Sequence, residues 1–449
     1  MKDKCGIFGI VSLNKDAISK TFFGLKQLQH RGQDGSGIGF IENNSIQTSK
    51  EIGLVGELEP KIENKESNMA IGHVRYATSS KKQCVSELQP LSSTDFLLVH
   101  NGNLPFCKNV YDTNYLKEFI EDLLKKGNSI EDSIIHLLES IPGVYNLLLL
   151  TDECIYAIKD RYGFRPLCIA RNDHSICIVS ESCALNDTYN VIKEVEPGEI
   201  IKITKHCEYT TLYRYESNIV KTVNTLENST KQIQPNAKFC MFENIYFMKP
   251  FTVRYDKSVY DTRFELGMLL AKQETWSFDS SYVVIGVPSS GIASGHGYST
   301  KLNLEYSQKI VKNKKSNRSF IEPTQEKRIN VLKNKFTLLS IPEKIIVIDD
   351  TIVRGNTMKQ LVSLLYEKGA KEIHIRIPAP IVKNECYFGV DIASKTELLS
   401  YNRSIEDMRH QLNVSSLAFI TNIEKYYSEN NYCLSCFKDN NLYNELLDW

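Results

Sequence analysis

The sequence predicts a sheet-rich amino-terminal half followed by an α/β domain built on a parallel sheet. From Cys5 to about Ile203, short apolar segments alternate with Gly-containing turns, which is typical of a sheet-rich domain. Three near-continuous apolar runs follow, VVIGVP (283–288), KIIVIDD (344–350) and EIHIRIP (372–378), and such runs are typical of strands buried on both faces of a parallel sheet. The length of 449 residues also exceeds what one hydrophobic core usually spans, so we expect two domains.

The remaining elements follow from local patterns. Two helical stretches are expected in the first half, near residues 16–29 and 114–126. Residues 216–238 contain almost no large apolar side chains, which predicts a connector between domains. Apolar residues recur at helical spacing in TMKQLVSLLYEKGAK (357–371), and Gly369 ends that pattern. This order predicts a right-handed strand-helix-strand unit, in which ligands bind beyond the carboxyl ends of the strands.

Composition narrows the classes of function. The chain has 54 basic and 54 acidic residues, so it has no net field to hold a nucleic acid, and none is expected as a partner. Its apolar runs fall far short of a membrane span, and its first residues lack the apolar core of a signal peptide, so a cytoplasmic protein is expected. In that reducing compartment, the 12 cysteines indicate buried thiols, a nucleophile or metal ligands rather than disulfides.

The stretch KIIVIDDTIVRGNT (344–357) carries the strongest functional signal. Asp349 and Asp350 follow an apolar strand and can accept hydrogen bonds from two ribose hydroxyls, while the N–H groups of the next loop can bind a phosphate. The alternative is an ordinary strand-loop-helix connection with acids that face water. VIDDTIVRGNT resembles the phosphoribosyl pyrophosphate signature of the phosphoribosyltransferase family. The resemblance implies a type I phosphoribosyltransferase fold for residues 236–449 and assigns to this ligand Asp349, Asp350, Thr351, Val353, Arg354, Gly355, Asn356 and Thr357.

Two further segments match that family in part. In VPSSGIASGHGY (287–298), Ser289 stands where the family has Asp, and Ser290 is expected to bind Mg²⁺ with Asp349 and Asp350 because Mg²⁺ prefers oxygen ligands. The run KNKKSNR (312–318) resembles the family's mobile loop, although charged runs are usually solvated surface. From it we expect Lys312 and Arg318 to contact phosphate, with Lys335 as a weaker candidate. Lys314, Lys315 and Ser316 depart from the family pattern, so the coupling between the two sites is expected to be weaker or to depend on other contacts.

The first half carries an ordered series of motifs. They are LQHRGQDGSGIGF from Leu28, GHVRYAT from Gly72, VHNGNL from Val99, GVYNLLLL from Gly143, DRYGFRPL from Asp160, SESCAL from Ser180 and EVEPGEI from Glu194. In order and spacing they resemble the glutamine amidotransferase domain whose nucleophile is an amino-terminal cysteine. The resemblance implies an α+β amino-terminal-nucleophile (Ntn) hydrolase sandwich for residues 5–235.

There is a chemical reason for the nucleophilic cysteine to be the first residue of the mature chain. Its own α-amino group, with an ordinary pKa of about 7.7 to 8.0, can take the thiol proton and return it to the leaving ammonia. In the encoded chain the amine of Cys5 is blocked by Met1–Lys4, so the resemblance implies cleavage of a four-residue propeptide. Without the other motifs, Cys5 would be a plain core thiol.

The same resemblance assigns roles to residues of the glutamine site. It implies that Arg75 binds the glutamine carboxylate, that Asn101 and the Gly102 N–H form the oxyanion hole, that Arg31 lies near the nucleophile at the glutamine, and that Asp112 holds the α-ammonium group. The alternatives are that Arg75 is an ordinary surface charge, that Asn101-Gly102 forms a hairpin turn, and that Asp112 caps a helix. The loop before Asp112 is shorter than the family's.

Four cysteines form a separate pattern. Cys433 and Cys436 in YCLSC have a spacing that suits metal ligation, while Cys240 and Cys386 stand alone, so structural zinc and unrelated buried thiols are alternatives. The positions match the four ligands of the iron-sulfur branch of the amidophosphoribosyltransferase family, whose members also carry a propeptide. The resemblance therefore implies a 4Fe-4S cluster with a folding role.

The whole pattern implies one function. Members of this family use glutamine and phosphoribosyl pyrophosphate to make phosphoribosylamine, glutamate and pyrophosphate in the first step of purine synthesis, as homotetramers inhibited by purine nucleotides. Hexosamine and asparagine synthetases share the first half, but the phosphate loop argues against both. A non-catalytic, phosphoribosyl pyrophosphate-sensing regulator is the other alternative, supported by Ser289 and the altered mobile loop.

Overall fold

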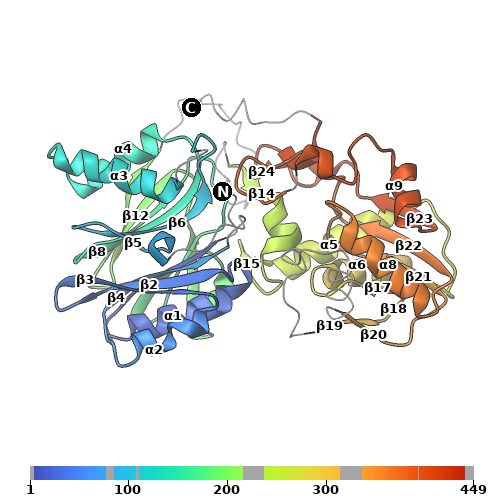
Figure 1. The fold of residues 1–449 in the computed structure, drawn as a ribbon, viewed down its shortest axis with the longest axis horizontal. Coiled ribbons are helices and arrows are strands. Elements are labelled where there is room, and N and C mark those ends of the chain that lie inside the picture. The colour runs from blue at the N-terminus through green and yellow to red at the C-terminus, as the bar shows by residue number, and fades with distance from the viewer. Residues whose placement is uncertain are drawn as a thin grey trace, which may run out of the picture.

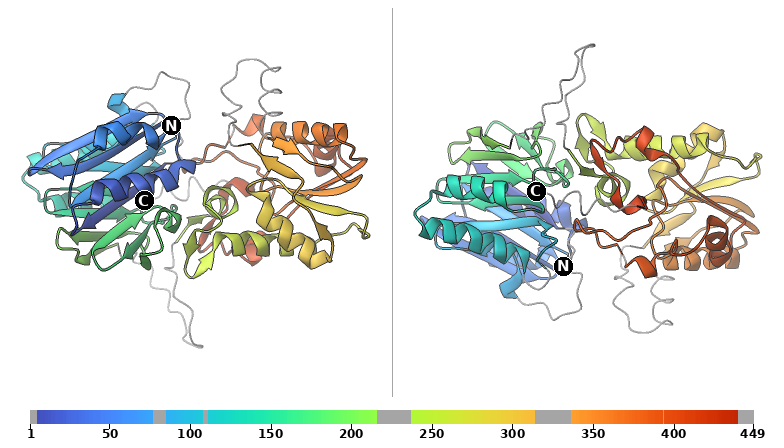
Figure 2. Two further views of the ribbon diagram at one scale, coloured as in Figure 1. Left: turned by 90° about the horizontal axis from the view of Figure 1, so that it is seen from below. Right: turned by 90° about the horizontal axis from the view of Figure 1, so that it is seen from above.

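The structure is a computed structural model that describes residues 5–76, 85–107, 111–215, 237–313, 336–392 and 394–439. These residues form two domains that lie side by side (Figures 1 and 2). Among the helices described, none combines the length and the apolar character that crossing a membrane requires. Several predicted features lie outside the described residues, namely the propeptide Met1–Lys4, most of the connector, Arg318 and Lys335.

The amino-terminal domain is built on two antiparallel sheets. The seven-stranded sheet has the order β11-β9-β10-β1-β4-β2-β3, and the six-stranded sheet the order β13-β12-β8-β7-β6-β5. The first contains β1 (Gly6–Ser12), β2 (Gly35–Glu42), β3 (Ser45–Ile52), β4 (Met69–Arg75), β9 (Cys168–Arg171), β10 (Ser175–Val179) and β11 (Asn190–Glu194). The second contains β5 (Leu91–Ser92), β6 (Leu97–Asn103), β7 (Val144–Leu150), β8 (Cys154–Lys159), β12 (Glu199–Thr204) and β13 (Tyr209–Arg214).

Alternation along the strands decides which face each side chain covers. In β1, Ile7 and Val11 lie in the core between the two sheets, whereas Phe8 and Ile10 face the helices on the outer side. The outer side of the seven-stranded sheet packs against α1 (Ala17–Gln27) and α2 (Glu59–Ile62), and that of the six-stranded sheet against α3 (Asp112–Lys125) and α4 (Ile130–Ser140). Four layers result, helix on sheet on sheet on helix (Figure 1). This confirms the predicted sandwich.

Helix α4 was missed by the sequence analysis. Its start is well defined, because the Ser129 hydroxyl accepts a hydrogen bond from the Asp132 N–H at 3.0 Å. Ile134, Leu137 and Leu138 supply the buried face at helical spacing. The Ser129 cap and the helical spacing of the apolar residues are both visible in the sequence, so α4 could have been predicted.

The carboxy-terminal domain has a parallel five-stranded sheet in the order β18-β17-β21-β22-β23. Its strands are β17 (Val283–Gly286), β18 (Glu305–Tyr306), β21 (Lys344–Ile348), β22 (Glu372–Ile377) and β23 (Ser416–Phe419). Figure 2 shows helices on both faces of this sheet; they are α5 (Val259–Lys272), α6 (Gly291–Leu302), α8 (Asn356–Glu367) and α9 (Ile405–Leu412). The three predicted apolar strands and the β21-α8-β22 unit are confirmed.

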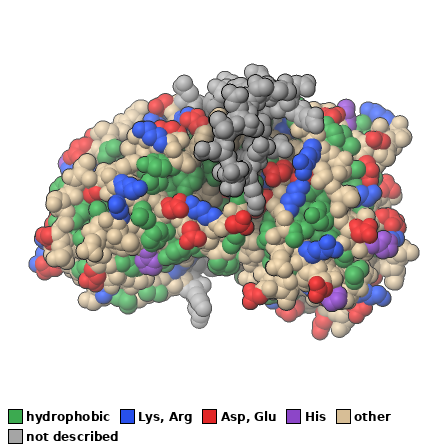
Figure 3. Space-filling view, turned by 180° about the vertical axis from the view of Figure 1, so that it is seen from behind, with side chains coloured by type: hydrophobic (Ala, Val, Ile, Leu, Met, Phe, Trp, Pro, Cys, Tyr) green, Lys and Arg blue, Asp and Glu red, His purple; other side chains and the backbone are tan. Residues whose placement is uncertain are grey.

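Short elements complete this domain. Two-stranded antiparallel pairs join β19 (Ile310–Lys312) to β20 (Phe336–Leu338) and β15 (Val253–Arg254) to β16 (Lys257–Ser258). A parallel pair joins β14 (Phe239–Cys240) to β24 (Tyr432–Cys433), and a π-helix (Glu243–Phe247) follows β14 at the junction with the amino-terminal domain. On the face drawn in Figure 3, acidic and basic side chains are interspersed, in keeping with the balanced charge.

Candidate active sites

Cys5 lies at one end of the sandwich, directly before β1, with only 1% of its surface exposed. Gly6 pairs with Val74 of β4, which brings Cys5 to the end of that strand, where Arg75 lies. Ile7 belongs to the core between the sheets, and Cys5, two residues earlier, is expected on the same face. The same alternation applies to His73 and Arg75, which follow Ile71 of that core at intervals of two. The thiol and Arg75 therefore share the inter-sheet face.

Asn101 and Gly102 lie inside β6, where they pair with Asn146 and Tyr145 of β7, so they do not form a hairpin turn. Asn101 is fully buried, and neither amide atom of its side chain has a hydrogen-bond partner among the described residues. Leaving a buried polar group unpaired costs about 1–3 kcal/mol, and a ligand that pairs with the amide would remove that cost. This is the behaviour expected of a preorganised oxyanion hole.

The close packing around residue 102 leaves no room for a side chain. A Cβ at this position would lie 1.9 Å from the Val144 carbonyl oxygen and 2.7 Å from His100 Nε2. Any other residue would have to displace β7 backbone, so the close approach of β6 and β7 fixes the glycine.

Arg75 and Asp112 lie in surroundings that suit a charged ligand. Arg75 is 5% exposed, with Nη2 3.2 Å from a carboxylate oxygen of Glu87 and its guanidinium 5.8 Å from the ring centre of Tyr111. Asp112 is the first residue of α3; its carboxylate accepts from the Thr113 N–H at 2.9 Å and lies 3.8 Å from His100 Nδ1. Their roles toward glutamine stay predictions.

Two buried histidines next to these residues were missed. Burial lowers the pKa of His73 to about 3, and the nearby Arg75 adds to this effect. Burial also lowers the pKa of His100, against the opposing effect of Asp112. Both rings are therefore neutral at physiological pH. Two-residue alternation from Arg75 in GHVRYAT was a signal that could have found His73.

Arg31 binds the backbone of Cys5 and a carboxylate of each domain. Its Nε donates to the Cys5 carbonyl oxygen at 3.0 Å, Nη1 donates to Glu181 at 2.6 Å, and Nη2 donates to Glu243 of the other domain at 2.8 Å. Burial by itself lowers the pKa of Arg31, but Glu243 and Glu181 outweigh it and raise that pKa above its ordinary value. All three nitrogens contact protein groups, which suits a positioning role; its predicted contact with glutamine stays a prediction.

Arg165 is a second buried arginine at the junction. Its Nη1 donates to Glu243 at 3.0 Å and its Nη2 to the Phe388 carbonyl oxygen at 3.0 Å. The sequence analysis quoted Arg165 within DRYGFRPL without a role, and it gave Glu243 none. No local pattern marks such a contact, because the partners are 78 residues apart.

His30, Glu181 and Cys183 form a three-residue group whose ligand atoms all lie within 4.8 Å of one another. The Glu181 carboxylate already accepts from Arg31, from His30 at 2.8 Å and from the Thr252 hydroxyl at 2.7 Å. A divalent cation would meet the Arg31 charge at close range. This group is therefore better suited to joining the domains than to holding a metal.

The second site lies at the carboxyl ends of β17 and β21. Asp349 and Asp350 directly follow β21, and the Ser290 hydroxyl lies 3.4 Å from Asp349 Oδ1. The Asp350 N–H donates to Asp349 Oδ1 at 2.9 Å, and the Thr351 hydroxyl donates to Asp350 Oδ2 at 2.7 Å. The predicted oxygen ligands Ser290, Asp349 and Asp350 are thus brought together.

Two helix N-termini meet at this edge of the sheet. Helix α6 begins directly after Ser290, and α8 begins after Gly355, whose φ of +77° lies in the left-handed region that favours glycine. Aligned peptide dipoles give each N-terminus a partial positive charge that suits phosphate. The loop 351–355 is tied down where the Leu399 N–H donates to the Val353 carbonyl oxygen at 2.8 Å.

The basic candidates are placed differently. Arg354 is paired with Glu397 at 3.2 Å, and its side chain is 41% exposed. Lys312 ends β19, paired with Phe336 of β20. Arg263 of α5 was missed: burial lowers its pKa, while the charges of Asp350 and Glu181 act in the opposite direction.

The four cysteines come together at the junction. Cys240 pairs with Cys433 in the β14-β24 ladder, and the Cys436 carbonyl oxygen accepts from the Lys383 and Asn384 N–H groups, close to Cys386 in the chain. Burial raises the pKa of Cys433 to about 11. Burial together with Cys386, Cys433 and Cys240 raises the pKa of Cys436. Such thiols stay neutral until a metal displaces their protons, so the donor set fits a thiolate-bound metal group.

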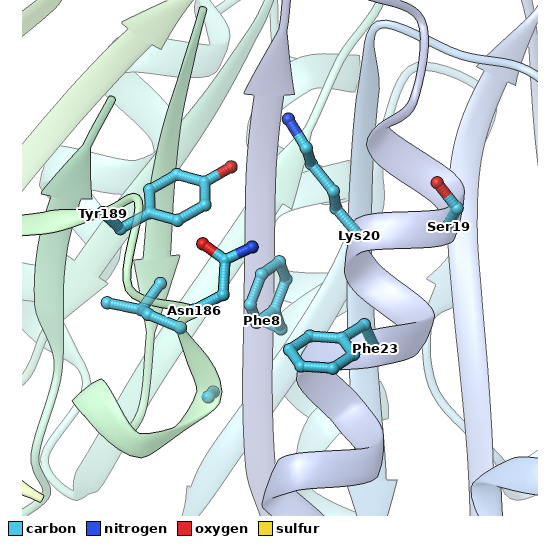
Figure 4. Close-up of a pocket in the computed structure, with 8 residues that line it drawn as sticks. Phe8, Ser19, Lys20, Phe23, Asn186 and Tyr189 are labelled. Carbon is cyan, nitrogen blue, oxygen red and sulfur yellow. The ribbon is translucent and has the colours of Figure 1, made fainter. Parts of the chain in front are cut away.

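A surface pocket on the amino-terminal domain is separate from these sites. Phe8, Lys20, Phe23 and Tyr189 line it, between β1, α1 and the segment before β11 (Figure 4). Phe8 faces the helix side of β1, whereas Cys5 lies toward the inter-sheet side. Lys20 is held by Asp16 at 3.0 Å. None of the residues that line this pocket belongs to either candidate active site.

Comparison with known proteins is consistent with both sites. The model of the phosphoribosyl transferase domain family matches residues 266–411. An amidophosphoribosyltransferase of Methanocaldococcus jannaschii is 33% identical over 460 residues, covering 96% of each chain. Amidophosphoribosyltransferase 2, chloroplastic, of Arabidopsis thaliana is 32% identical, covering 97% of this chain and 79% of the plant protein.

Solved structures give the same match for the fold. A glutamine phosphoribosylpyrophosphate amidotransferase of B. subtilis, complexed with ADP and GMP, aligns with a TM-score of 0.81 and 28% identity over 97% of both chains. A structure described as the allosteric regulatory enzyme of purine biosynthesis aligns with a TM-score of 0.83 and 28% identity over 97% of this chain and 96% of the other.

Proposed function

Since this chain belongs to the amidophosphoribosyltransferase family, we propose that its two sites act in sequence, one releasing ammonia from glutamine and the other adding it to phosphoribosyl pyrophosphate. The products are glutamate, phosphoribosylamine and pyrophosphate, in the first step of purine biosynthesis. The observation that carries this proposal is the presence in one chain of two features: the buried amide of Asn101, which has no partner among the described residues, and the twin carboxylates at the end of β21.

In the first half-reaction, the α-amine of Cys5, exposed by removal of Met1–Lys4, takes the thiol proton. The sulfur then attacks the side-chain carbonyl of glutamine, and Asn101 with the Gly102 N–H stabilises the resulting oxyanion. The amine returns its proton to the leaving nitrogen, so ammonia departs and a thioester forms. Water then cleaves the thioester and releases glutamate. Arg75 and Asp112 bind the charged groups of glutamine.

In the second half-reaction, Asp349 and Asp350 accept hydrogen bonds from the ribose hydroxyls, while the loop 351–357 and Lys312 bind phosphate. Ammonia attacks the anomeric carbon, the bond to pyrophosphate breaks, and the nitrogen loses a proton. The oxygens of Ser290, Asp349 and Asp350 suit Mg²⁺, which when bound neutralises charge on the leaving pyrophosphate. An enclosed path between the sites would keep ammonia from water, where it would be protonated.

For the four cysteines we propose a 4Fe-4S cluster. Four cysteine thiolates are the usual ligands of such a cluster and also of structural zinc. The match of all four positions to the iron-sulfur branch of the family supports the cluster, which would join β14 to the carboxy-terminal segment. Iron and sulfide analysis separates the two.

Further properties are proposed by analogy with the relatives. The B. subtilis structure contains ADP and GMP, which supports purine nucleotides as inhibitors of this chain. We also propose a cytoplasmic homotetramer.

Pyrophosphate release, measured with glutamine and then with ammonia as the nitrogen source, tests the function. The mature protein is expected to turn over with either source, and Cys5→Ala is expected to use ammonia alone. Absence of turnover with both sources, in protein that has lost residues 1–4, would favour the regulator instead.

A further inference from the structure

The buried carboxylate of Glu243 joins the two domains close to Cys5 in the contact network. Glu243 has no exposed surface and accepts from two arginines of the amino-terminal domain, from Arg31 Nη2 at 2.8 Å and from Arg165 Nη1 at 3.0 Å. It begins the π-helix Glu243–Phe247 and follows the cluster cysteine Cys240 by three residues. Removing one partner of such a buried pair would leave the other charge unpaired away from water, so the arrangement is strongly held.

The same π-helix is held on its other side by Arg263 of α5. Arg263 Nε donates to the Asn244 carbonyl oxygen at 2.8 Å, and Nη2 donates to the Met248 carbonyl oxygen at 2.8 Å. Arg263 lies within electrostatic reach of Asp350 in the phosphoribosyl site. Contacts therefore run from Cys5 through Arg31 and Glu243 to the π-helix, and from the π-helix to Arg263 of α5.

We propose that Glu243 is a positioning residue for glutamine hydrolysis, acting across the domain boundary through Arg31 on the backbone of Cys5. The inference rests on the proposed function of Cys5. Arg31 has a planar guanidinium, so fixing its two terminal nitrogens also fixes the direction of Nε toward the Cys5 carbonyl. Without the Glu243 charge, Nη2 loses its charged partner and Nη1 keeps only Glu181, so the guanidinium is held less firmly against the Cys5 carbonyl.

The expected effect falls on one half-reaction. A misplacement of about 1 Å at a reacting group can lower a rate about 10²-fold. Cys5 belongs to the glutamine site, whereas ammonia supplied from solution reaches the phosphoribosyl site without it. Loss of the Glu243 charge is therefore expected to lower glutamine-dependent turnover and to spare ammonia-dependent turnover.

The test compares Glu243→Gln with a matched control, Glu274→Gln. Glu274 has a largely covered carboxylate, with 6% of its side-chain surface exposed, that is paired with Arg376 at 2.6 Å; Glu243 and Glu274 both lie in the carboxy-terminal domain. For Glu243→Gln we expect about a ten-fold or larger fall in glutamine-dependent kcat, little change in the KM for glutamine, and ammonia-dependent turnover within about two-fold of wild type. Alkylation of Cys5 by iodoacetamide, followed by intact mass, should slow in parallel. Glu274→Gln should leave the ratio of the two activities unchanged.

Arg31→Lys gives a second measurement, because lysine keeps the charge but cannot span both carboxylates and the carbonyl; it should show the same selective loss even if Glu243→Gln does not fold. Equal loss of both activities, or no loss of either, in a folded variant would overturn the proposal. Failure of the proposed function would look different, since wild-type protein would then use neither nitrogen source.

Discussion

Cys240 and Cys433 are paired residues of one short parallel ladder, although 193 positions separate them in the chain. The pair ties the segment that enters the carboxy-terminal domain to the segment that leaves it. Because Glu243 follows Cys240 by three residues, the same ladder also holds the carboxylate that contacts Arg31 and Arg165. A metal group bound there would stabilise the junction on which both arginines depend.

Cys433→Ser is expected to remove most of the bound iron and to lower the unfolding temperature, since a serine hydroxyl is a poor substitute for a thiolate ligand. Iron and sulfide analysis of anaerobically purified protein, together with thermal unfolding, measures both effects. Cys107→Ser, at a partly exposed thiol elsewhere, should change neither. Unchanged iron content in Cys433→Ser would rule out this ligand set.

Gly102→Ala is expected to lower glutamine-dependent turnover about 10²-fold or more, because the added methyl would lie 1.9 Å from the Val144 carbonyl oxygen and displace an oxyanion donor. Ammonia-dependent turnover should persist. Gly56→Ala is the matched control, since a Cβ there meets nothing within 4 Å among the described residues. A Gly102→Ala variant with normal glutamine kinetics would remove Gly102 from the oxyanion hole.

Asp349→Asn and Asp350→Asn should each raise the KM for phosphoribosyl pyrophosphate about 10- to 100-fold, since a hydrogen bond to a charged group contributes about 1.5–3 kcal/mol. Both nitrogen sources should be affected equally, because the loss lies at the shared acceptor. Initial rates over a range of substrate concentrations provide the measurement. The control is Asp279→Asn, because Asp279 is an exposed acid that accepts a hydrogen bond from Ser281; this variant should retain the wild-type KM. An unchanged KM in both Asp349→Asn and Asp350→Asn would contradict the assignment of these acids to the ribose hydroxyls.

The stability of the amino-terminal domain should fall in acid because of His73. Its pKa is about 3 in the folded chain and about 6.5 when unfolded, so below pH 6.5 the unfolded state binds the extra proton. The contribution of neutral His73 to the free energy of unfolding is complete above pH 6.5 and declines by about 1.4 kcal/mol for each pH unit below it. Denaturant midpoints between pH 7 and pH 5 should show a shallower slope for His73→Gln than for wild type. Identical slopes would mean that His73 is protonated in the folded protein.

Much of each site could be predicted from the sequence, because its parts are local. The acids and phosphate loop after β21 lie within one strand-loop-helix unit, and Arg75 and Asn101 lie in short motifs, GHVRYAT and VHNGNL, that resemble those of a known family. The hairpin alternative for Asn101-Gly102 failed because the pairing of β6 with β7 continues through both residues.

The sequence by itself determined the strands and helix of the β21-α8-β22 unit, and its motifs, through their resemblance to a known family, determined the two architectures. Periodicity, loop chemistry and residue type are local properties of the chain. Only the tertiary structure decided that Glu243 binds Arg31 and Arg165, that Arg263 binds the Asn244 and Met248 carbonyls, and that Cys240 lies opposite Cys433. These contacts depend on how two domains pack, and side chains far apart in the chain leave no periodic signal of their meeting.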